Sequence, residues 1–104
     1  MEFVESSLFT RQIGRLLSDE EYRDLQVVLT RSPRAGDVIP GGGGLRKIRW
    51  RSGGRGKRGG IRVIYYCWLE QRLYMVFAYD KAEQGDLTPE QLKVLRSRVL
   101  GGVV

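Results

Sequence analysis

The residues of this chain that could do chemistry are its cations. Eight of the eighteen lysines and arginines fall between residues 41 and 66, where no acidic residue interrupts them. They are Arg46, Lys47, Arg49, Arg51, Arg55, Lys57, Arg58 and Arg62. Nine of the fourteen glycines lie between Gly41 and Gly60. Because a basic, glycine-rich segment can fold closely around a phosphate chain but cannot build a core, the sequence predicts a polyanion site here.

The available residue types limit the reactions that the chain can catalyse. It has no histidine, which excludes Ser-His-Asp and Cys-His nucleophiles, and its single cysteine, Cys67, can form neither an intrachain disulfide nor a Cys/His zinc site. Carboxylates are scarce near the basic stretch, which argues against a two-metal nuclease. We therefore expect no metal and no cofactor.

Metal-free phosphoryl transfer on RNA remains possible with these residues. In that reaction the substrate's own 2′-hydroxyl attacks the adjacent phosphate, while the protein aligns the reactants and stabilises the developing charge. Lysines and arginines suit this role, because a lysine crowded by other cations gives up its proton more readily and can act as a base.

Strands are expected to position these cations. In the first, Leu45–Arg51, alternation places Lys47, Arg49 and Arg51 on one face and apolar side chains on the other. The next strand, Ile61–Leu69, is largely apolar on both faces, so it should be central in a sheet. Since neighbouring like charges repel, the cationic face should need an anion to compensate it.

The remaining elements are expected to give the sheet a core. Residues 1–5 read as a short strand, and two amphipathic helices follow, the second opening on the Ser18/Glu21 capping box and ending at Ser32-Pro33. A further strand spans Leu73–Tyr79, and Thr88-Pro89 opens the last helix. The predicted order is β-α-α-β-β-β-α, an α+β fold with a mainly antiparallel, curved sheet and the helical hairpin on one face. The connector at 34–40 can hold one or two strand-like residues, at Asp37–Ile39.

Composition bounds the class of protein. A chain of 104 residues with 41% hydrophobic residues should form one globular domain, residues 1–104. The net charge of +6 favours a nucleic acid, an acidic protein or both as partners. No segment approaches the roughly 18 apolar residues of a membrane span, and the acidic N-terminus does not resemble a secretory signal. We expect a cytoplasmic protein with no membrane partner.

Three motifs together resemble a known family. They are Leu45-Arg46-Lys47-Ile48-Arg49, the run Gly56-Lys57-Arg58-Gly59-Gly60-Ile61-Arg62-Val63-Ile64-Tyr65-Tyr66, and Tyr79-Asp80-Lys81-Ala82-Glu83-Gln84-Gly85-Asp86-Leu87. At these distances they resemble the RelE/HigB toxins of type II toxin–antitoxin systems, most closely the HigB-like branch. The resemblance extends over the N-terminal helical hairpin and implies a RelE-like fold.

The resemblance also implies a function. Such a toxin is a ribosome-dependent endoribonuclease (an mRNA interferase), which enters the ribosomal A site beside 16S rRNA and cleaves translating mRNA through the 2′-hydroxyl. A cyclic phosphate remains on the product. A cognate antitoxin, expected here to be a helix-turn-helix, HigA-like protein, holds the toxin silent. The chain is therefore expected to inhibit translation and arrest growth.

By position, the resemblance assigns roles to residues of this chain. The catalytic pair on the first core strand falls on Lys47 and Arg49, and the arginine that stabilises the transition state falls on Arg62. The basic residue after the last strand falls on Lys81, with Tyr79 beside it. Some family members carry a catalytic tyrosine near the C-terminal helix where this chain has a threonine, so the general base is left open among Lys47, Lys81 and Tyr79.

The other cations are expected to bind RNA or the ribosome: Arg46, Arg51, Arg55, Lys57 and Arg58. The last three sit among glycines, where side chains are poorly fixed, so they should contact phosphates rather than take part in the chemical step.

Two interpretations without catalysis stay open. The chain can be a basic module that binds RNA or ribosomes, or a protein whose basic face docks an acidic partner. At the level of single residues, Arg62 can equally form an ion pair with Glu70 or Asp80 across the sheet. Cleavage of mRNA only when ribosomes are present separates the enzyme from both alternatives.

Overall fold

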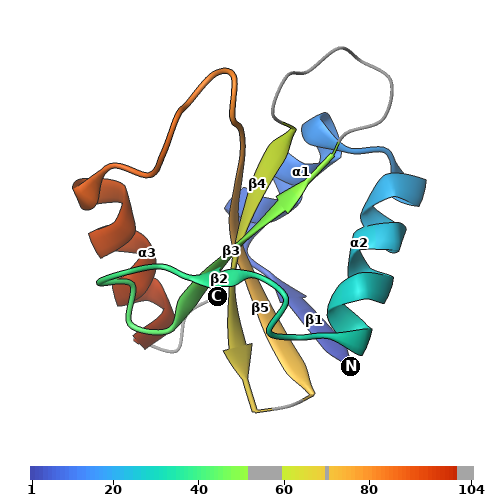
Figure 1. Ribbon diagram of the computed structural model, residues 1–104, viewed down its shortest axis with the longest axis horizontal. Coiled ribbons are helices and arrows are strands. Elements are labelled where there is room, and N and C mark those ends of the chain that lie inside the picture. Colours follow the sequence, from blue (N-terminus) through green and yellow to red (C-terminus); the bar gives the residue numbers. More distant parts are fainter. Residues whose placement is uncertain (52–59, 70, 101–104) are drawn as a thin grey trace.

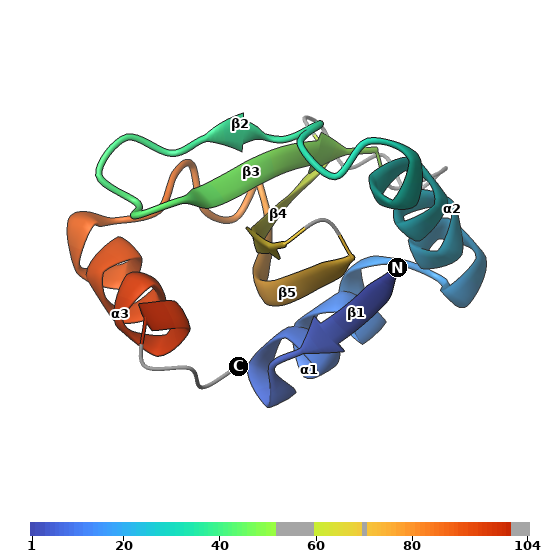
Figure 2. The same cartoon turned by 90° about the horizontal axis from the view of Figure 1, so that it is seen from below.

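The protein folds as a five-stranded sheet with helices on both faces. The structure, a computed structural model, describes residues 1–51, 60–69 and 71–100. Its elements are β1 (Glu2–Glu5), α1 (Ser7–Leu16), α2 (Asp19–Arg31), β2 (Asp37–Val38), β3 (Leu45–Trp50), β4 (Ile61–Trp68), β5 (Arg72–Asp80) and α3 (Pro89–Leu100). Figures 1 and 2 show the α1–α2 hairpin on one side of the sheet and α3 on the other. The α+β class and the helical hairpin on one face are confirmed.

The strand order is β1-β5-β4-β3-β2. Neighbouring strands are antiparallel except for β1, which runs parallel to β5. The sheet is thus mainly antiparallel, as predicted, and β4 lies at its centre. No helix in the described ranges is long and apolar enough to cross a membrane.

Helix starts follow from side-chain caps that can be read in the sequence. Ser18 Oγ accepts from the Glu21 amide (3.1 Å) and Glu21 Oε1 accepts from the Ser18 amide (2.8 Å), which completes the predicted capping box of α2. Thr88 and Gln91 make the same reciprocal pair at the start of α3, at 3.1 and 2.9 Å. Each pair satisfies two amides that a helix start would leave unbonded.

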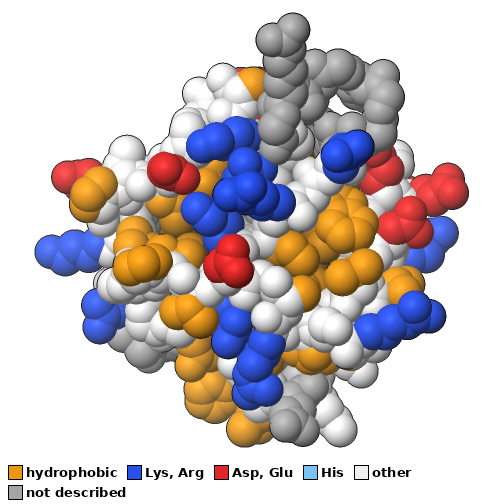
Figure 3. All heavy atoms as spheres, in the orientation of Figure 1, with side chains coloured by type: hydrophobic (Ala, Val, Ile, Leu, Met, Phe, Trp, Pro, Cys, Tyr) orange, Lys and Arg blue, Asp and Glu red, His pale blue; other side chains and the backbone are white. Residues whose placement is uncertain are grey.

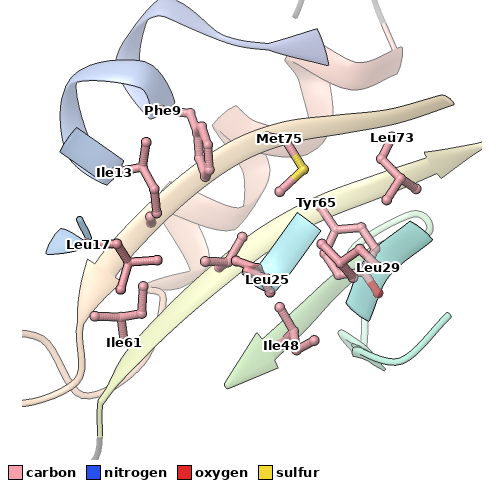
Figure 4. Packing of buried hydrophobic residues seen from close by; sticks show 12 residues of the cluster. Phe9, Ile13, Leu17, Leu25, Leu29, Ile48, Ile61, Tyr65, Leu73 and Met75 are labelled. Atoms are coloured by element: carbon pink, nitrogen blue, oxygen red, sulfur yellow. The ribbon is translucent and has the colours of Figure 1, made fainter. Parts of the chain in front are cut away.

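The main core lies between the hairpin and the sheet. Figure 4 shows Phe9 and Ile13 of α1 and Leu25 and Leu29 of α2 directed toward the strands, where Met75 and other side chains meet them. Phe9, Leu25, Leu29 and Met75 are fully buried. Since burial of one such side chain contributes about 1.5–3 kcal/mol, this layer holds the fold together and fixes the sheet.

A second, smaller core lies on the opposite face of the sheet. Leu95 of α3 packs with Leu45, Ile64, Val76 and Tyr79, with further partly buried side chains from the same helix. In the structure α3 covers one part of this face, and the cations occupy another.

The connector contains the short edge strand β2, where one or two strand-like residues were expected at Asp37–Ile39; the β-α-α-β-β-β-α order leaves it out. Asp37 pairs with Lys47 and Val38 with Arg46. The Tyr65 hydroxyl anchors the connector, since it donates to the Pro33 carbonyl (2.7 Å) and accepts from the Gly36 amide (2.9 Å). These contacts lie far apart in sequence, so they depend on the tertiary fold.

A β-bulge in β5 changes which side chains face the cations. Ile64 pairs with Phe77, but Tyr65 pairs with Met75, so Val76 is an extra residue. The Val76 carbonyl accepts from the Ser6 hydroxyl (3.1 Å) at the cap of α1. Because the extra residue inverts the alternation along β5, Tyr74 and Tyr79 lie on the same face although they are five positions apart.

Candidate active site

Strand register brings the predicted catalytic residues together on the face opposite the hairpin. Arg49 of β3 pairs with Arg62 of β4, which pairs with Tyr79 of β5. Two residues before Arg49 in β3, Lys47 pairs with Ile64, whose side chain belongs to the core under α3. Directly paired residues of antiparallel strands direct their side chains to the same face. Lys47, Arg49, Arg62 and Tyr79 therefore share one surface.

Lys47 and Lys81 meet at a single carboxylate. The Oδ1 atom of Asp86 lies 3.5 Å from Lys47 Nζ and 4.0 Å from Lys81 Nζ. The Lys47 side chain is 30% exposed, and that of Asp86 is 73% exposed. Asp86 is thus the anion that compensates the charge of this part of the cationic face.

The turn that carries Asp86 is held by its own hydrogen bonds. Lys81 Nζ donates to the Gly85 carbonyl at 2.7 Å. Gln84 Nε2 donates both to the Asp86 carbonyl (3.2 Å) and to Gln91 Oε1 (2.6 Å). Because Gln91 also closes the cap of α3, the helix start fixes the position of Asp86 relative to the two lysines.

Tyr79 is buried, and its hydroxyl has no hydrogen-bond partner among the described residues. Burial raises the pKa of this phenol above its usual value of 10.0; the charge of Asp86 raises it further, and that of Arg62 lowers it. The hydroxyl is therefore protonated at neutral pH and can donate a hydrogen bond.

Arg62 is the most enclosed cation of the site, with only 6% of its surface exposed. One of its guanidinium nitrogens donates to the Ile61 carbonyl at 3.3 Å. A cation on the central strand, with its position fixed on both sides by β3 and β5, is suited to stabilise a developing charge because it needs little reorganisation. Figure 3 shows lysine and arginine side chains gathered on this face of the molecule, with an acidic side chain at their edge.

The predicted RNA-binding residues are not all brought to this surface. Arg46 pairs with Tyr65 on the hairpin side of the sheet, and its guanidinium donates to the Gly36 (2.8 Å) and Arg34 (3.3 Å) carbonyls. Arg51 is exposed directly after β3. The remaining predicted cations, Arg55, Lys57 and Arg58, lie outside the described residues.

The sequence analysis assigned no role to Asp86, although this residue belongs to the motif that runs from Tyr79 to Leu87. A signal was present, since Asp86 lies five positions after a predicted catalytic lysine in a motif that is otherwise read through its cations. In the parts of the chain that the structure describes, no three His, Cys, Asp or Glu side chains come together as a potential metal site.

Residues 10–100 match the family model described as the RelE toxin of the RelE/RelB toxin–antitoxin system. The chain belongs to the RelE toxin family. The matched range runs from α1 to α3 and includes every residue of the site. This RelE-family protein is thus the toxin member of a toxin–antitoxin system, whose partner is an antitoxin. The match does not distinguish the HigB-like branch from the rest of the family.

Proposed function

We propose that this RelE-family toxin is a ribosome-dependent endoribonuclease that cleaves mRNA in the A site and so inhibits translation. The observation that carries the proposal is the meeting of Lys47 and Lys81 at Asp86, on the same sheet face as Arg62 and Tyr79. A scissile phosphate that replaced the carboxylate would lie between two cations, Lys47 on β3 and Lys81 directly after β5. Such pre-positioned cations stabilise charge in the transition state.

The proposed reaction consumes no water. The 2′-oxygen of the substrate bonds to phosphorus while the bond to the 5′-oxygen breaks. The 2′-hydroxyl proton passes to a base, and the leaving 5′-oxygen receives a proton. The products carry a 2′,3′-cyclic phosphate and a 5′-hydroxyl. In this scheme Arg62 and Arg49 stabilise the phosphorane charge, Lys47 or Lys81 acts as the base, and Tyr79 donates a hydrogen bond.

The same proposal implies the RNA partners, the site of action and the kind of antitoxin. Arg51 and the loop cations Arg55, Lys57 and Arg58 contact phosphates of mRNA or 16S rRNA, and the site of action is the cytoplasm, where ribosomes translate. Motif spacing favours the HigB-like branch, and with it a helix-turn-helix, HigA-like antitoxin. Arg46 is left out of the RNA-binding set, because its guanidinium is bonded to the connector on the other face.

The test is cleavage of a defined mRNA by the purified toxin with and without programmed ribosomes. We expect cleavage only with ribosomes, and end analysis should find a 2′,3′-cyclic phosphate. Products with 5′-phosphate ends would contradict attack by the 2′-hydroxyl. Salt-sensitive binding of RNA without cleavage would instead favour the alternative, a non-catalytic basic module.

The burial of the side chains decides whether Arg62 or Lys47 is the better position for an inactive control variant. Since Arg62 is enclosed, Arg62→Ala would leave a hole in the sheet and confound loss of activity with loss of stability. Lys47→Ala removes a partly exposed side chain and is the cleaner variant.

A further inference from the structure

The outer edge of β5 passes from a strand neighbour to a helix neighbour halfway along its length. The pairing with β1 ends where Glu5 lies opposite Met75. From there the chain of β1 continues into α1, which packs against β5. Backbone groups on an edge that loses its partner strand need other hydrogen-bond partners. Two side chains, one at the cap of α1 and one within the helix, provide them.

Ser6 binds two successive carbonyls of β5. Its amide donates to the Met75 carbonyl (3.0 Å), and its hydroxyl donates to the Val76 carbonyl (3.1 Å). Successive carbonyls of a regular strand point to opposite edges, so two that point to the same residue mark the bulge. Since Ser6 and Val76 are both buried, loss of the hydroxyl would leave the Val76 carbonyl without this donor, away from water. The hydroxyl therefore stabilises the bulged form of β5.

Gln12 binds the strand directly after the bulge. Its Oε1 accepts from the Ala78 amide at 2.8 Å. Ala78 is buried and immediately precedes Tyr79, which pairs with Arg62. The bonds from Ser6 and Gln12 thus hold the backbone of β5 on both sides of residue 77, between the bulge and the active site.

We propose that Ser6 and Gln12 are positioning residues of the active site, which act through the backbone of β5 to keep Tyr79 beside Arg62. The proposal rests on the endoribonuclease function, in which Tyr79 donates a hydrogen bond. The bulge decides which face of the sheet Tyr79 occupies, and the Gln12 bond fixes the peptide before it. Orientation of this kind matters, because misplacement of a catalytic group by about 1 Å costs on the order of a hundredfold in rate.

The competing interpretation is that Ser6 merely caps α1. Its hydroxyl oxygen does accept from the Phe9 amide at 3.0 Å, as that of Ser18 accepts from the Glu21 amide at 3.1 Å. A cap needs only an acceptor. The hydroxyl of Ser6 also donates its proton to a carbonyl seventy positions away, and among the described residues Ser18 makes no such bond to β5. Ser18→Ala is therefore a matched control that removes a cap of the same kind.

The test uses variants that remove or keep each bond. Ser6→Ala and Gln12→Leu remove one bond to β5 each, whereas Ser6→Thr keeps the hydroxyl and Gln12→Glu keeps the acceptor. Two quantities are measured: the single-turnover cleavage rate on programmed ribosomes, and the ring signals of Tyr79 in the free toxin labelled with ¹³C-tyrosine. Tyr79→Phe assigns those signals.

We expect Ser6→Ala and Gln12→Leu to cut the single-turnover rate about tenfold, with ribosome binding within about twofold of wild type, and to shift the Tyr79 ring signals. Ser6→Thr and Gln12→Glu should restore most of the rate. Ser18→Ala should lose stability but keep both the rate and the signals. Because Gln12 is only partly buried, Gln12→Leu carries the test if Ser6→Ala folds poorly.

Unchanged Tyr79 signals in both Ser6→Ala and Gln12→Leu would overturn the proposal, as would an unchanged rate in a toxin that cleaves. An equal loss of rate in Ser18→Ala, compared at the same folded fraction, would also overturn it, since general destabilisation would then explain the loss. The ring signals need no cleavage. A toxin in which they shift as expected but which never cuts mRNA would overturn the proposed function and leave the placement of Tyr79 by Ser6 and Gln12 standing.

Discussion

Replacing Asp86 by asparagine should make the free toxin bind RNA more tightly. In the structure one Asp86 oxygen lies within 3.5 Å of Lys47 Nζ and 4.0 Å of Lys81 Nζ. A phosphate that takes these ammonium groups must displace the carboxylate and then tolerate its charge nearby. Asparagine keeps the size of the side chain but removes both penalties.

The magnitude follows from the exposure of the pair. An exposed ion pair contributes about 0.2–1 kcal/mol, and two such pairs are lost when the phosphate enters. With Asp86 73% exposed, the lower half of that range applies to each pair. The sum, about 1 kcal/mol, corresponds to roughly fivefold tighter binding of RNA by Asp86→Asn. The gain should shrink as salt rises, because screening weakens exposed pairs.

The assay is fluorescence anisotropy with a 2′-O-methyl RNA oligonucleotide, which cannot be cleaved through the 2′-hydroxyl. Glu83→Gln is the matched control: it removes the same charge from the same turn, and no ion pair is found for Glu83 among the described residues. Equal tightening by both variants would mean that only net charge matters. Unchanged or weaker binding by Asp86→Asn would refute the idea that Asp86 competes with the phosphate.

Three further outcomes are expected. Lys47→Ala should cut the single-turnover cleavage rate by on the order of a hundredfold, with ribosome binding nearly intact, because it removes a fixed group that acts at the phosphate. Neutralising Arg55, Lys57 and Arg58 together should lower the salt dependence of ribosome binding by roughly one counterion per lost contact and leave the rate at saturation within about tenfold, a barrier change of roughly 1.4 kcal/mol. Tyr79→Phe should lose less stability in alkali than the wild type. The folded state raises the pKa of Tyr79 above 10.0, so unfolding releases a proton above that pH and the wild type is destabilised as pH rises. Urea unfolding at pH 8 and pH 11 measures the difference.

Local sequence determined where most elements begin and which residues each strand shows to one face. The Ser18/Glu21 and Thr88/Gln91 caps could be predicted, because both partners lie within one helical turn. Alternation along β3 separated Lys47 from the apolar Ile48, which is buried in the hairpin core. Such features depend on neighbours a few positions away in the chain, so they can be predicted from the sequence alone.

Strand register and the turn after β5 bring Lys47, Lys81 and Asp86 together. Alternation places Arg46 on the face opposite Lys47, but only the connector carbonyls show what its guanidinium binds there. Asp86 lies 39 positions from Lys47, and nothing in local pattern says that the turn folds back over β3. Contacts between distant segments are set by packing of the whole sheet against its helices.

The face occupied by Tyr79 was decided by a single inserted residue. Strict alternation from Tyr74 would direct Tyr79 into the hairpin core, away from the cations. The bulge at Val76 inverts the alternation and places Tyr79 beside Arg62. The bulge itself is fixed by pairing with β4 and by the Ser6 hydroxyl, seventy positions away. The sequence alone therefore determined which residues are chemically able to act on RNA. Only the tertiary structure decided which of them share a surface, because one extra residue in a strand reverses every side chain beyond it.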